Sequence, residues 1–389
     1  MINNLIFPLA GYGKRFVNEG YIQTKPLINA GRKTLIEWAV ESVKIDSNTN
    51  LIFVVRKDQC ITNGIDSFLT QHYPNCKIVK LDKPTNGSLE TVNLALDELN
   101  IEGHLHIHTS DIVIPNPVDL SKAFEKNNEA ATYTFKANNP NYSYCMLNDD
   151  NPEKVDYMIE KEIISQIANV GIYSFRSVDE FRKHSISLLK NDRKVKNEFY
   201  ISSVFELLIS DGAFVRSIEV PDVHIVGTPS ELKFFSQYVL PTMNPGIIGL
   251  VSDHSGFKFK KELIALLNQS SYTTVDYGCF SISSCDYSDY VPIACKGLID
   301  SEVDLVIGSC QSGQGVNIAA NHQKNILSII PMNKDSLVEA RQHNCPNFLS
   351  FPSRLWKPID AYNAFSDSYN NSHFQGGRHS TRIQKLLGM

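Results

Sequence analysis

Apolar and amphipathic segments alternate along the first half of the chain. Four apolar runs have the length of a buried strand: Leu5–Leu9, Leu51–Val55, Lys77–Leu81 and Leu105–His108. Between them, Thr34–Val43 and Ser88–Leu99 carry apolar residues at helical spacing. This alternation predicts βαβ units with a largely parallel sheet. Three later strand-like segments follow one another without a helix and predict an antiparallel extension: Ala131–Lys136, Ser143–Leu147 and Val170–Phe175.

The second half restarts the same alternation after a break. Leu240–Gly246 is rich in turn residues, so we place a boundary there between a first domain, residues 1–240, and a second, residues 246–389. We expect the second domain to be a doubly wound parallel sheet. It contains the helical segment Lys258–Leu267 and four strand-like runs: Ile247–Val251, Thr274–Asp276, Leu305–Ile307 and Leu327–Ile330. Residues 369–372 are expected to form a mobile loop.

Composition narrows the class of protein. A hydrophobic content of 42% and a charged content of 20% are ordinary for a globular chain. No stretch approaches the roughly 18 apolar residues of a membrane span, and the N-terminal run is too short for a signal peptide. The net charge of −5 with no basic stripe argues against a nucleic-acid partner, and the eight scattered cysteines fit free thiols in a reducing compartment. We therefore expect a cytoplasmic protein with no membrane partner.

A glycine-rich turn follows the first apolar run. Its backbone N–H groups can hold phosphates, and the residues concerned are Leu9, Ala10, Gly11 and Gly13. A glycine pair alone also suits a plain strand-to-helix turn. Here, however, Arg15 and Lys25 can neutralise a leaving pyrophosphate, and Asp111 can hold a Mg²⁺ that bridges the phosphates. The combination indicates nucleotidyl transfer.

The glycine loop with Arg15, followed by Lys25-Pro-Leu, resembles the sugar-phosphate nucleotidyltransferases of surface-polysaccharide biosynthesis. The resemblance covers most of the first domain and implies a Rossmann-type mixed sheet. It also implies nucleotide contacts at Gly87 and Ser88, and a sugar-side segment that contains Glu160, Lys161 and Gly171. Relatives often have a second metal-binding aspartate two residues before the glycine that corresponds to Gly227, but this chain has Ile225 there. The alternatives are Asp222, His224, or Asp111 acting alone.

Three histidines, His104, His106 and His108, alternate along one predicted strand and therefore share a face. Alternate positions on a strand are roughly 7 Å apart, so the three side chains cannot all reach one ion. We expect no metal there, and expect His108 to line the pocket near Asp111.

A second candidate site begins at Cys310, which ends an apolar run and precedes a glycine loop and a helix start. Open α/β sheets bind ligands at the carboxyl ends of their strands. The positive end of the following helix would favour the thiolate of Cys310, which could then act as a base. An isolated cysteine there would more simply be an apolar filler, but further motifs accompany it: Asp253-His254-Ser-Gly256, Arg341-Gln-His343-Asn344 and Gly376-Gly-Arg378-His379 with Arg382.

Together these motifs resemble the B-type ribose-5-phosphate isomerases and the related galactose-6-phosphate isomerases, across residues 246–389. The resemblance implies that Cys310 moves a proton between C2 and C1 of a phosphosugar with no metal or organic cofactor, and that His343 assists ring opening. It further implies an enediolate-binding loop (Gln311, Ser312, Gly313, Gly315) and substrate contacts from Asp253, His254, Asn344, Arg378 and Arg382. It also implies a homodimer or higher homo-oligomer with a shared site. Gln311 and Ser288 depart from the family pattern, which leaves the preferred sugar open.

The sequence therefore predicts a bifunctional enzyme of activated-sugar or alditol biosynthesis. One domain would transfer a nucleotidyl group from an NTP, with CTP favoured, to a sugar or polyol phosphate. The other would interconvert ribose 5-phosphate and ribulose 5-phosphate. The alternative is a nucleotidyltransferase whose second domain serves dimerisation or ligand sensing.

Overall fold

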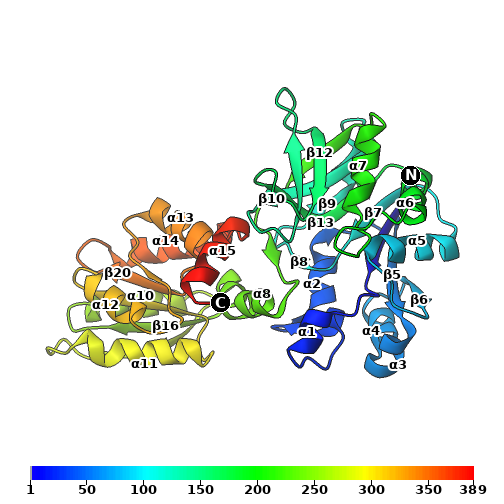
Figure 1. Cartoon of the computed structure of the whole chain (residues 1–389). Helices are drawn as coiled ribbons and strands as arrows, with labels where there is room; N and C mark the ends of the chain where they lie inside the picture. The colour runs from blue at the N-terminus through cyan, green and yellow to red at the C-terminus, as the bar shows by residue number, and fades with distance from the viewer. Residues whose placement is uncertain (1) are drawn as a thin grey trace. The chain divides into compact units, whose positions relative to one another are not determined.

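The computed structural model describes residues 2–389 and divides the chain into two compact units. The first unit ends at Leu232 and the second runs from Lys233 to Met389 (Figure 1). Within the described residues, every helix is too short or too polar to cross a bilayer.

Parallel strands form the centre of the first unit. β1 (Asn3–Pro8) pairs in parallel with β5 (Thr49–Arg56) on one side and with β7 (His104–His108) on the other, and β6 (Lys77–Leu81) pairs with β5. All four strands lie where the apolar runs predicted them. Their carboxyl ends meet at one edge of the sheet, where the glycine turn follows β1.

An antiparallel extension begins beyond β7, as predicted. β13 (Ile167–Phe175) runs antiparallel to β7 and pairs with both β11 (Ser143–Leu147) and β10 (Ala130–Lys136). The remaining strands of this region are β12 (Val155–Glu160), antiparallel to β11, and β14 (Val215–Glu219), parallel to β10. The result is the expected mixed sheet.

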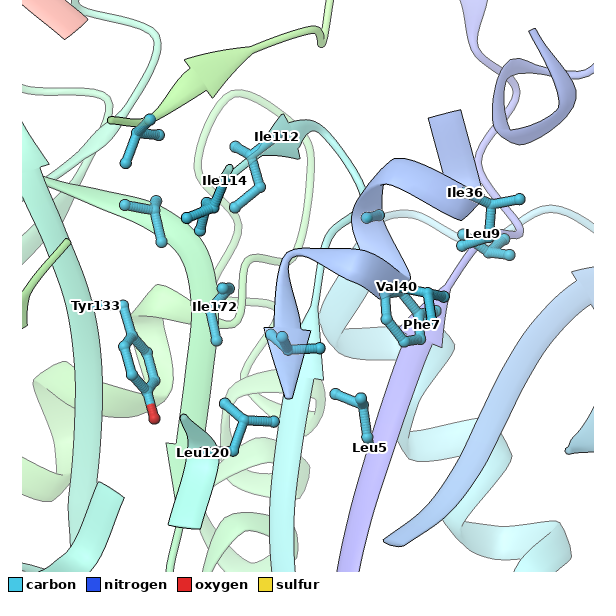
Figure 2. Close-up of a cluster of buried hydrophobic side chains, with 14 of the residues drawn as sticks. Leu5, Phe7, Leu9, Ile36, Val40, Ile112, Ile114, Leu120, Tyr133 and Ile172 are labelled. Carbon is cyan, nitrogen blue, oxygen red and sulfur yellow. The ribbon is translucent and has the colours of Figure 1, made fainter. Parts of the chain in front are cut away.

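Helices cover both faces of this sheet. On one face, α2 (Leu35–Glu41) and α4 (Ile65–His72) pack against a core that includes Phe7, Ile36 and Val40 (Figure 2). On the other face lie α5 (Ser88–Leu99), α6 (Val178–Lys190) and α7 (Ser202–Ser210). α2 begins at Thr34, whose hydroxyl and the Glu37 carboxylate form a capping box.

Short elements at the carboxyl edge carry several candidate residues. α1 (Lys14–Asn18) follows the glycine turn, and a 3₁₀ turn, η1, spans Lys25–Leu27. β8 (Ile112–Val113) pairs with β15 (His224–Ile225), and α8 (Pro229–Phe234) follows. The other short elements are β2 (Asn29–Ala30), β3 (Lys33–Thr34), β4 (Val43–Lys44), α3 (Lys57–Asn63), β9 (Val118–Asp119) and η2 (Leu120–Phe124).

The second unit is an all-parallel sheet of five strands in the order β17-β16-β18-β20-β19. Their bounds are β16 (Ile247–Ser252), β17 (Thr273–Asp276), β18 (Leu305–Cys310), β19 (Ser328–Ile329) and β20 (Phe348–Pro352). β20 was not among the predicted strands. Its apolar residues come between two helices, so it completes the doubly wound pattern that we expected.

Helices lie on both faces of this sheet as well. α10 (Phe257–Asn268), α13 (Lys334–Asn344) and α14 (Pro358–Asn371) share one core, and α11 (Tyr287–Ile299) and α12 (Gln314–Asn321) share the other. α15 (Gly377–Leu386) packs beside α13. The prediction of a mobile loop at 369–372 is wrong, because α14 extends through Asn371 and Tyr369 is buried in the core.

The segment between the domains belongs to the second unit. Residues 233–240, which we expected at the end of the first domain, form one helical stretch: the end of α8, a π-helical turn (Phe235–Val239) and the start of α9 (Leu240–Met243). The Tyr238 carbonyl accepts a hydrogen bond from Cys345, and the Thr242 hydroxyl accepts one from Arg341. These contacts with α13 and its end explain why the unit starts at Lys233.

Candidate active sites

The glycine turn of the first unit is tightly built. Gly13 has a φ of 61°, and a Cβ there would lie 3.2 Å from Cβ of Lys25. A side chain at position 13 would therefore be strained and crowded against η1. Gly11, in contrast, faces open space. The turn thus leaves its outer side accessible while its inner side contacts the segment that carries Lys25.

Two residues that sequence reasoning missed hold this turn from behind. The buried Arg56 guanidinium donates hydrogen bonds to the carbonyl oxygens of Ala10 (2.9 Å) and Gly11 (2.7 Å). Gln59 donates to the Leu9 carbonyl at 3.3 Å. A charged residue at the exit of a buried strand, as Arg56 is at the end of β5, is the signal that could have identified it.

Lys25 and Asp111, which the sequence analysis assigned to the transferase site in different roles, lie together, and their ammonium and carboxylate form an ion pair. Asp111 lies beside Gly227, where a Cβ would be 3.2 Å from Asp111 Oδ2, and the N–H of Val226 donates to the Asp111 carbonyl at 2.8 Å. β8 and β15 therefore place Asp111 against the Gly227 turn. Half of the Asp111 side chain remains exposed to solvent.

A second carboxylate near Asp111 comes from Glu231 in α8. Burial raises the pKa of Glu231, and Asp111 raises it further while Lys25 opposes the shift. Asp222, one of our alternatives, instead accepts a hydrogen bond from Asn116, and His224 is buried in β15. Carboxylate oxygens suit Mg²⁺, so Asp111 and Glu231 fit the expected ion. Glu231 lies outside the motif position that we considered, which explains why it was missed.

The predicted sugar-side residues lie at the end of β12 (Glu160), in the turn after it (Lys161) and on β13 (Gly171). Glu160 is buried and accepts hydrogen bonds from the hydroxyls of Ser143 and Ser202, and burial raises its pKa. Lys161, with a φ of 59°, donates to the Tyr200 hydroxyl. Gly171 accepts a backbone hydrogen bond from Thr109 at 3.0 Å, which ties β13 to the exit of β7.

Gly87 and Ser88 start α5 at the same edge. A Cβ at Gly87 would lie 2.3 Å from the carbonyl oxygen of Phe199, so only glycine fits there. Phe199 and its neighbour Tyr200 were not predicted, because nothing in the local sequence marks a loop that packs on a distant glycine.

The three histidines of β7 are structural. His106 and His108 are buried, and burial lowers the pKa of each to about 3. His108 stacks on Phe7 and accepts a hydrogen bond from the N–H of Ser110, while His106 pairs with Ser174. His108 is thus in the core beneath the site, and the expectation that it lines the pocket is wrong. Within residues 2–389, no group of three metal-ligating side chains clusters.

The Cys310 site lies at the carboxyl edge of the second sheet. Cys310 ends β18 and is almost completely buried, next to the turn in which Gly313 has a φ of 72°. The N–H of Gln311 donates to Ser255 Oγ at 2.8 Å. Gln311 is thereby removed from the expected set of enediolate donors in this structure, which leaves Ser312, Gly313 and Gly315 of that set.

Asp253 and His254 are at the same edge, after β16. Asp253 Oδ1 accepts hydrogen bonds from the N–H groups of Ser255 and Gly256, both at 2.9 Å, so this carboxylate also caps the turn that leads to α10. His254 Nδ1 lies 3.0 Å from the carbonyl oxygen of Cys285. Arg354, which we did not predict, follows β20 and donates its N–H to the Gln311 carbonyl at 3.1 Å. These residues form the Cys310 half-site.

A separate group gathers around the end of α13 and the start of α15. The rings of His343 and His379 stack with centroids 4.4 Å apart. Arg378 Nε lies 3.5 Å from His379 Nε2, and burial, with His343, Arg378 and Arg382, lowers the pKa of His379 to about 4. We call this cluster, with Asn344, the His343 half-site.

The two half-sites lie at opposite edges of the sheet within one chain. α13 starts after β19 and ends just before β20, so His343 is near the amino end of β20, where Phe348 pairs with Val306. Cys310 pairs with Pro352 at the other end of the same strand. Four residues of strand separate these pairs, or about 13 Å. One chain therefore does not assemble all the predicted isomerase residues.

Comparison with known proteins gives a family match and structural neighbours. Residues 248–386 match the Ribose/Galactose Isomerase family. Ribose-5-phosphate isomerase B of Escherichia coli is 31% identical over 137 residues, which are 35% of this chain and 91% of that protein. A ribose 5-phosphate isomerase of Thermotoga maritima, 32% identical, covers 37% of this chain and 98% of its own, with a TM-score of 0.35.

The first unit has a different neighbour. A nucleoside-diphosphate-sugar pyrophosphorylase from Vibrio cholerae is 25% identical and covers 60% of this chain and 99% of its own, with a TM-score of 0.55. Both sequence-based fold assignments, a nucleotidyltransferase-like mixed sheet and a B-type isomerase domain, are confirmed.

Proposed function

Because this chain belongs to the ribose/galactose isomerase family through residues 248–386, we propose that it is a bifunctional enzyme with an isomerase unit and a nucleotidyltransferase unit. One observation carries the proposal. The chain holds a buried cysteine beneath a glycine turn in one unit and a Lys25–Asp111 pair beside a glycine turn in the other. Each arrangement serves a different reaction.

In the isomerase reaction, the Cys310 thiolate removes the proton from C2 of an aldose phosphate. The electrons form the C1–C2 double bond of an enediolate, and the hydroxyl proton moves from O2 to O1. Return of the carbon-bound proton to C1, as the C2–O2 double bond forms, gives the ketose phosphate. N–H groups of the glycine turn stabilise the negative oxygen. Ribose 5-phosphate and ribulose 5-phosphate are the proposed pair, and the reaction needs no cofactor.

His343, which would assist ring opening, lies on the far edge of the same chain. A second copy that presents its His343 half-site to the Cys310 half-site would complete the active site. Arg378, Arg382 and Asn344 would then contact the phosphate and hydroxyls of a substrate bound to the other subunit. We therefore propose a homodimer with shared sites.

In the transferase reaction, a phosphate oxygen of the acceptor attacks the α-phosphorus of an NTP while the bond to pyrophosphate breaks. Arg15 and Lys25 neutralise charge on the leaving group. Asp111 and Glu231 would hold Mg²⁺, which supplies charge neutralisation between the phosphates when it is bound. Lys25 now pairs with Asp111, so it is already in place at the site.

We favour CTP as donor and a sugar or alditol phosphate as acceptor, for synthesis of a capsule or similar polymer in the cytoplasm. The support is the resemblance of the motifs, since primary phosphates of pentoses and alditols are typically activated as CDP derivatives. The second candidate function is a transferase alone, in which the isomerase-like unit serves dimerisation or sensing. The observation that favours this second function is that the isomerase residues lie at two opposite edges of the sheet within one chain.

The test is a screen of the intact protein. Five common NTPs with Mg²⁺ are combined with ribose 5-phosphate, ribulose 5-phosphate, ribitol 5-phosphate and glucose 1-phosphate, and pyrophosphate release is measured. Isomerisation of ribose 5-phosphate is followed separately. We expect both activities, and Asp111→Ala should abolish only pyrophosphate release. Absence of isomerase turnover across pentose and hexose phosphates would leave the transferase-only function.

A further inference from the structure

The segment Glu198–Tyr200 contacts both the turn after β12 and the start of α5 in the first unit. It belongs to the loop before α7 and to none of the predicted motifs. Its backbone contacts the nucleotide-side turn, and its side chains contact the sugar-side lysine. No other described segment makes hydrogen bonds to both Asn86 at the Gly87 turn and Lys161.

Backbone hydrogen bonds hold the nucleotide side. The N–H of Phe199 donates to the Asn86 carbonyl at 2.7 Å, and the N–H of Leu89 donates to the Phe199 carbonyl at 3.2 Å. Gly87 lies between them with no room for a side chain. A shift of Phe199 would therefore displace the turn that precedes α5.

Side chains hold the acceptor side. The Lys161 ammonium donates to the Tyr200 hydroxyl and lies 4.3 Å from the centre of its ring. The Tyr200 hydroxyl in turn donates to Glu198, whose carboxylate is 3.9 Å from Lys161. Tyr200 thus contacts the ammonium with both its ring face and its oxygen, and Glu198 fixes the direction of the hydroxyl.

Lys161 and Arg15 supply two positive charges near this group, and the Glu198 carboxylate offsets one of them. Lys161 is mostly buried, and Arg15 is close enough to act on the titration of Tyr200. Glu160 is biased toward its neutral form by burial, which raises its pKa. Burial, then Glu198, raises the pKa of Tyr200, so the phenol remains a neutral donor. Only one of the three N–H donors of Lys161 is used by Tyr200.

We propose that Tyr200, oriented by Glu198, is a positioning residue that fixes the Lys161 ammonium as the ligand for the phosphomonoester of the acceptor. The backbone of Phe199 links this position to the nucleotide-side turn. The inference rests on the proposed transferase function. The acceptor class that it names is a phosphomonoester, whose phosphate would bind Lys161.

The test compares Tyr200→Phe with Tyr200→Leu. Phenylalanine keeps the ring beneath Lys161 but removes the hydroxyl, and leucine removes both. With CTP and ribitol 5-phosphate, which has no carbonyl for the isomerase unit to act on, Tyr200→Phe should raise the acceptor KM about tenfold and leave the CTP KM within about twofold. Tyr200→Leu should raise the acceptor KM further, and Glu198→Gln less. Tyr157→Phe, on the exposed side of β12, is the matched control.

A merely structural role would change stability or both KM values together, so equal shifts in the two KM values would overturn the proposal. A second readout does not depend on turnover. Reductive methylation of Lys161 in the intact protein, followed by peptide mass spectrometry, should be faster in Tyr200→Phe. An unchanged methylation rate would refute the contact itself. If methylation of Lys161 is faster in Tyr200→Phe but the wild-type protein releases no pyrophosphate, the contact is present and the proposed transferase function is wrong.

Discussion

The two units place their reactive residues in opposite ways. In the first unit, segments from distant parts of the chain converge at one edge of the sheet, so that Lys25 meets Asp111 and Lys161 meets Tyr200 within a single copy. In the second unit, Cys310 and His343 are at opposite ends of the sheet. In this chain the mixed sheet brings its candidate residues together within one copy, whereas the doubly wound sheet separates them into two half-sites.

The difference follows from the connections. In the first unit, β8 and β15 are short strands that return the chain to Asp111, and the loop before α7 returns it to the Gly87 turn. In the second unit, every helix from α10 to α14 runs between the two ends of the sheet, so each loop belongs to one edge or the other. A site that needs residues from both edges of the second sheet therefore needs a second copy of the chain.

The largest expected effect comes from Cys310→Ala. Removal of the base should lower isomerase kcat by about 10² to 10⁴-fold, while pyrophosphate release stays unchanged because the first unit contains none of the isomerase residues. Coupled assays of both reactions on the same preparation measure this. Loss of both activities, with a lowered unfolding temperature, would mean that the two units are not independent.

A mixing experiment tests the shared site directly. Cys310→Ala and His343→Ala should each be inactive as isomerases. When equal amounts are refolded together, about half of the dimers contain one copy of each variant, and each such dimer has one intact site out of two. The mixture should therefore recover about a quarter of the wild-type activity. Mixtures of Asp111→Ala with Lys25→Ala should recover no transferase activity. Recovery of transferase activity in the Asp111→Ala and Lys25→Ala mixture would show that the transferase site is shared between copies. No recovery of isomerase activity in the Cys310→Ala and His343→Ala mixture would show that the isomerase site is not shared.

The smallest effect concerns acid stability. Burial lowers the pKa of His106 and His108 to about 3 from the ordinary 6.5, and that of His379 to about 4. These histidines therefore bind protons near pH 6.5 in the unfolded chain but not in the folded units. The free energy of unfolding is highest above pH 6.5 and falls as the pH drops toward 3. Between pH 7 and 5 the loss is about 2 kcal/mol for each histidine.

The first unit, with two such groups, should lose more stability than the second. Hydrogen-exchange protection, corrected for intrinsic rates and resolved by peptide, measures each unit separately. His108→Phe should flatten the pH dependence of the first unit only. Equal losses in both units would show that the β7 histidines do not control the response.

The sequence predicted most of the framework. Apolar runs located β1, β5, β6 and β7 and the start of the second sheet, because buried parallel strands have a strong pattern. The sequence analysis missed β20 because its apolar run, Phe348–Pro352, is interrupted by a serine and ends in proline. Residues 369–372 looked like a loop because two asparagines are poor helix formers, yet Tyr369 packs on Phe365 and α14 continues to Asn371.

The candidate sites were predictable where a residue acts through its own motif. Asp111 and Cys310 stand at strand exits, and Lys25 stands in the Lys-Pro-Leu motif that marks it. Glu231 and Tyr200 act through tertiary contacts with distant segments. Nothing local in the sequence encodes such contacts, and His108 shows the converse, since its position near Asp111 in sequence did not bring its ring to the surface.

The bonds from Arg56 and Gln59 to the glycine turn also have an electronic consequence. Three successive peptide groups, those that join Leu9 to Ala10, Ala10 to Gly11 and Gly11 to Tyr12, have their carbonyl oxygens bound by these side chains. A donor bound to a carbonyl withdraws electron density through the amide and makes the N–H of the same peptide a stronger donor. In the proposed nucleotide site, Arg56 would thereby strengthen hydrogen bonds from the turn to a phosphate without contacting that phosphate.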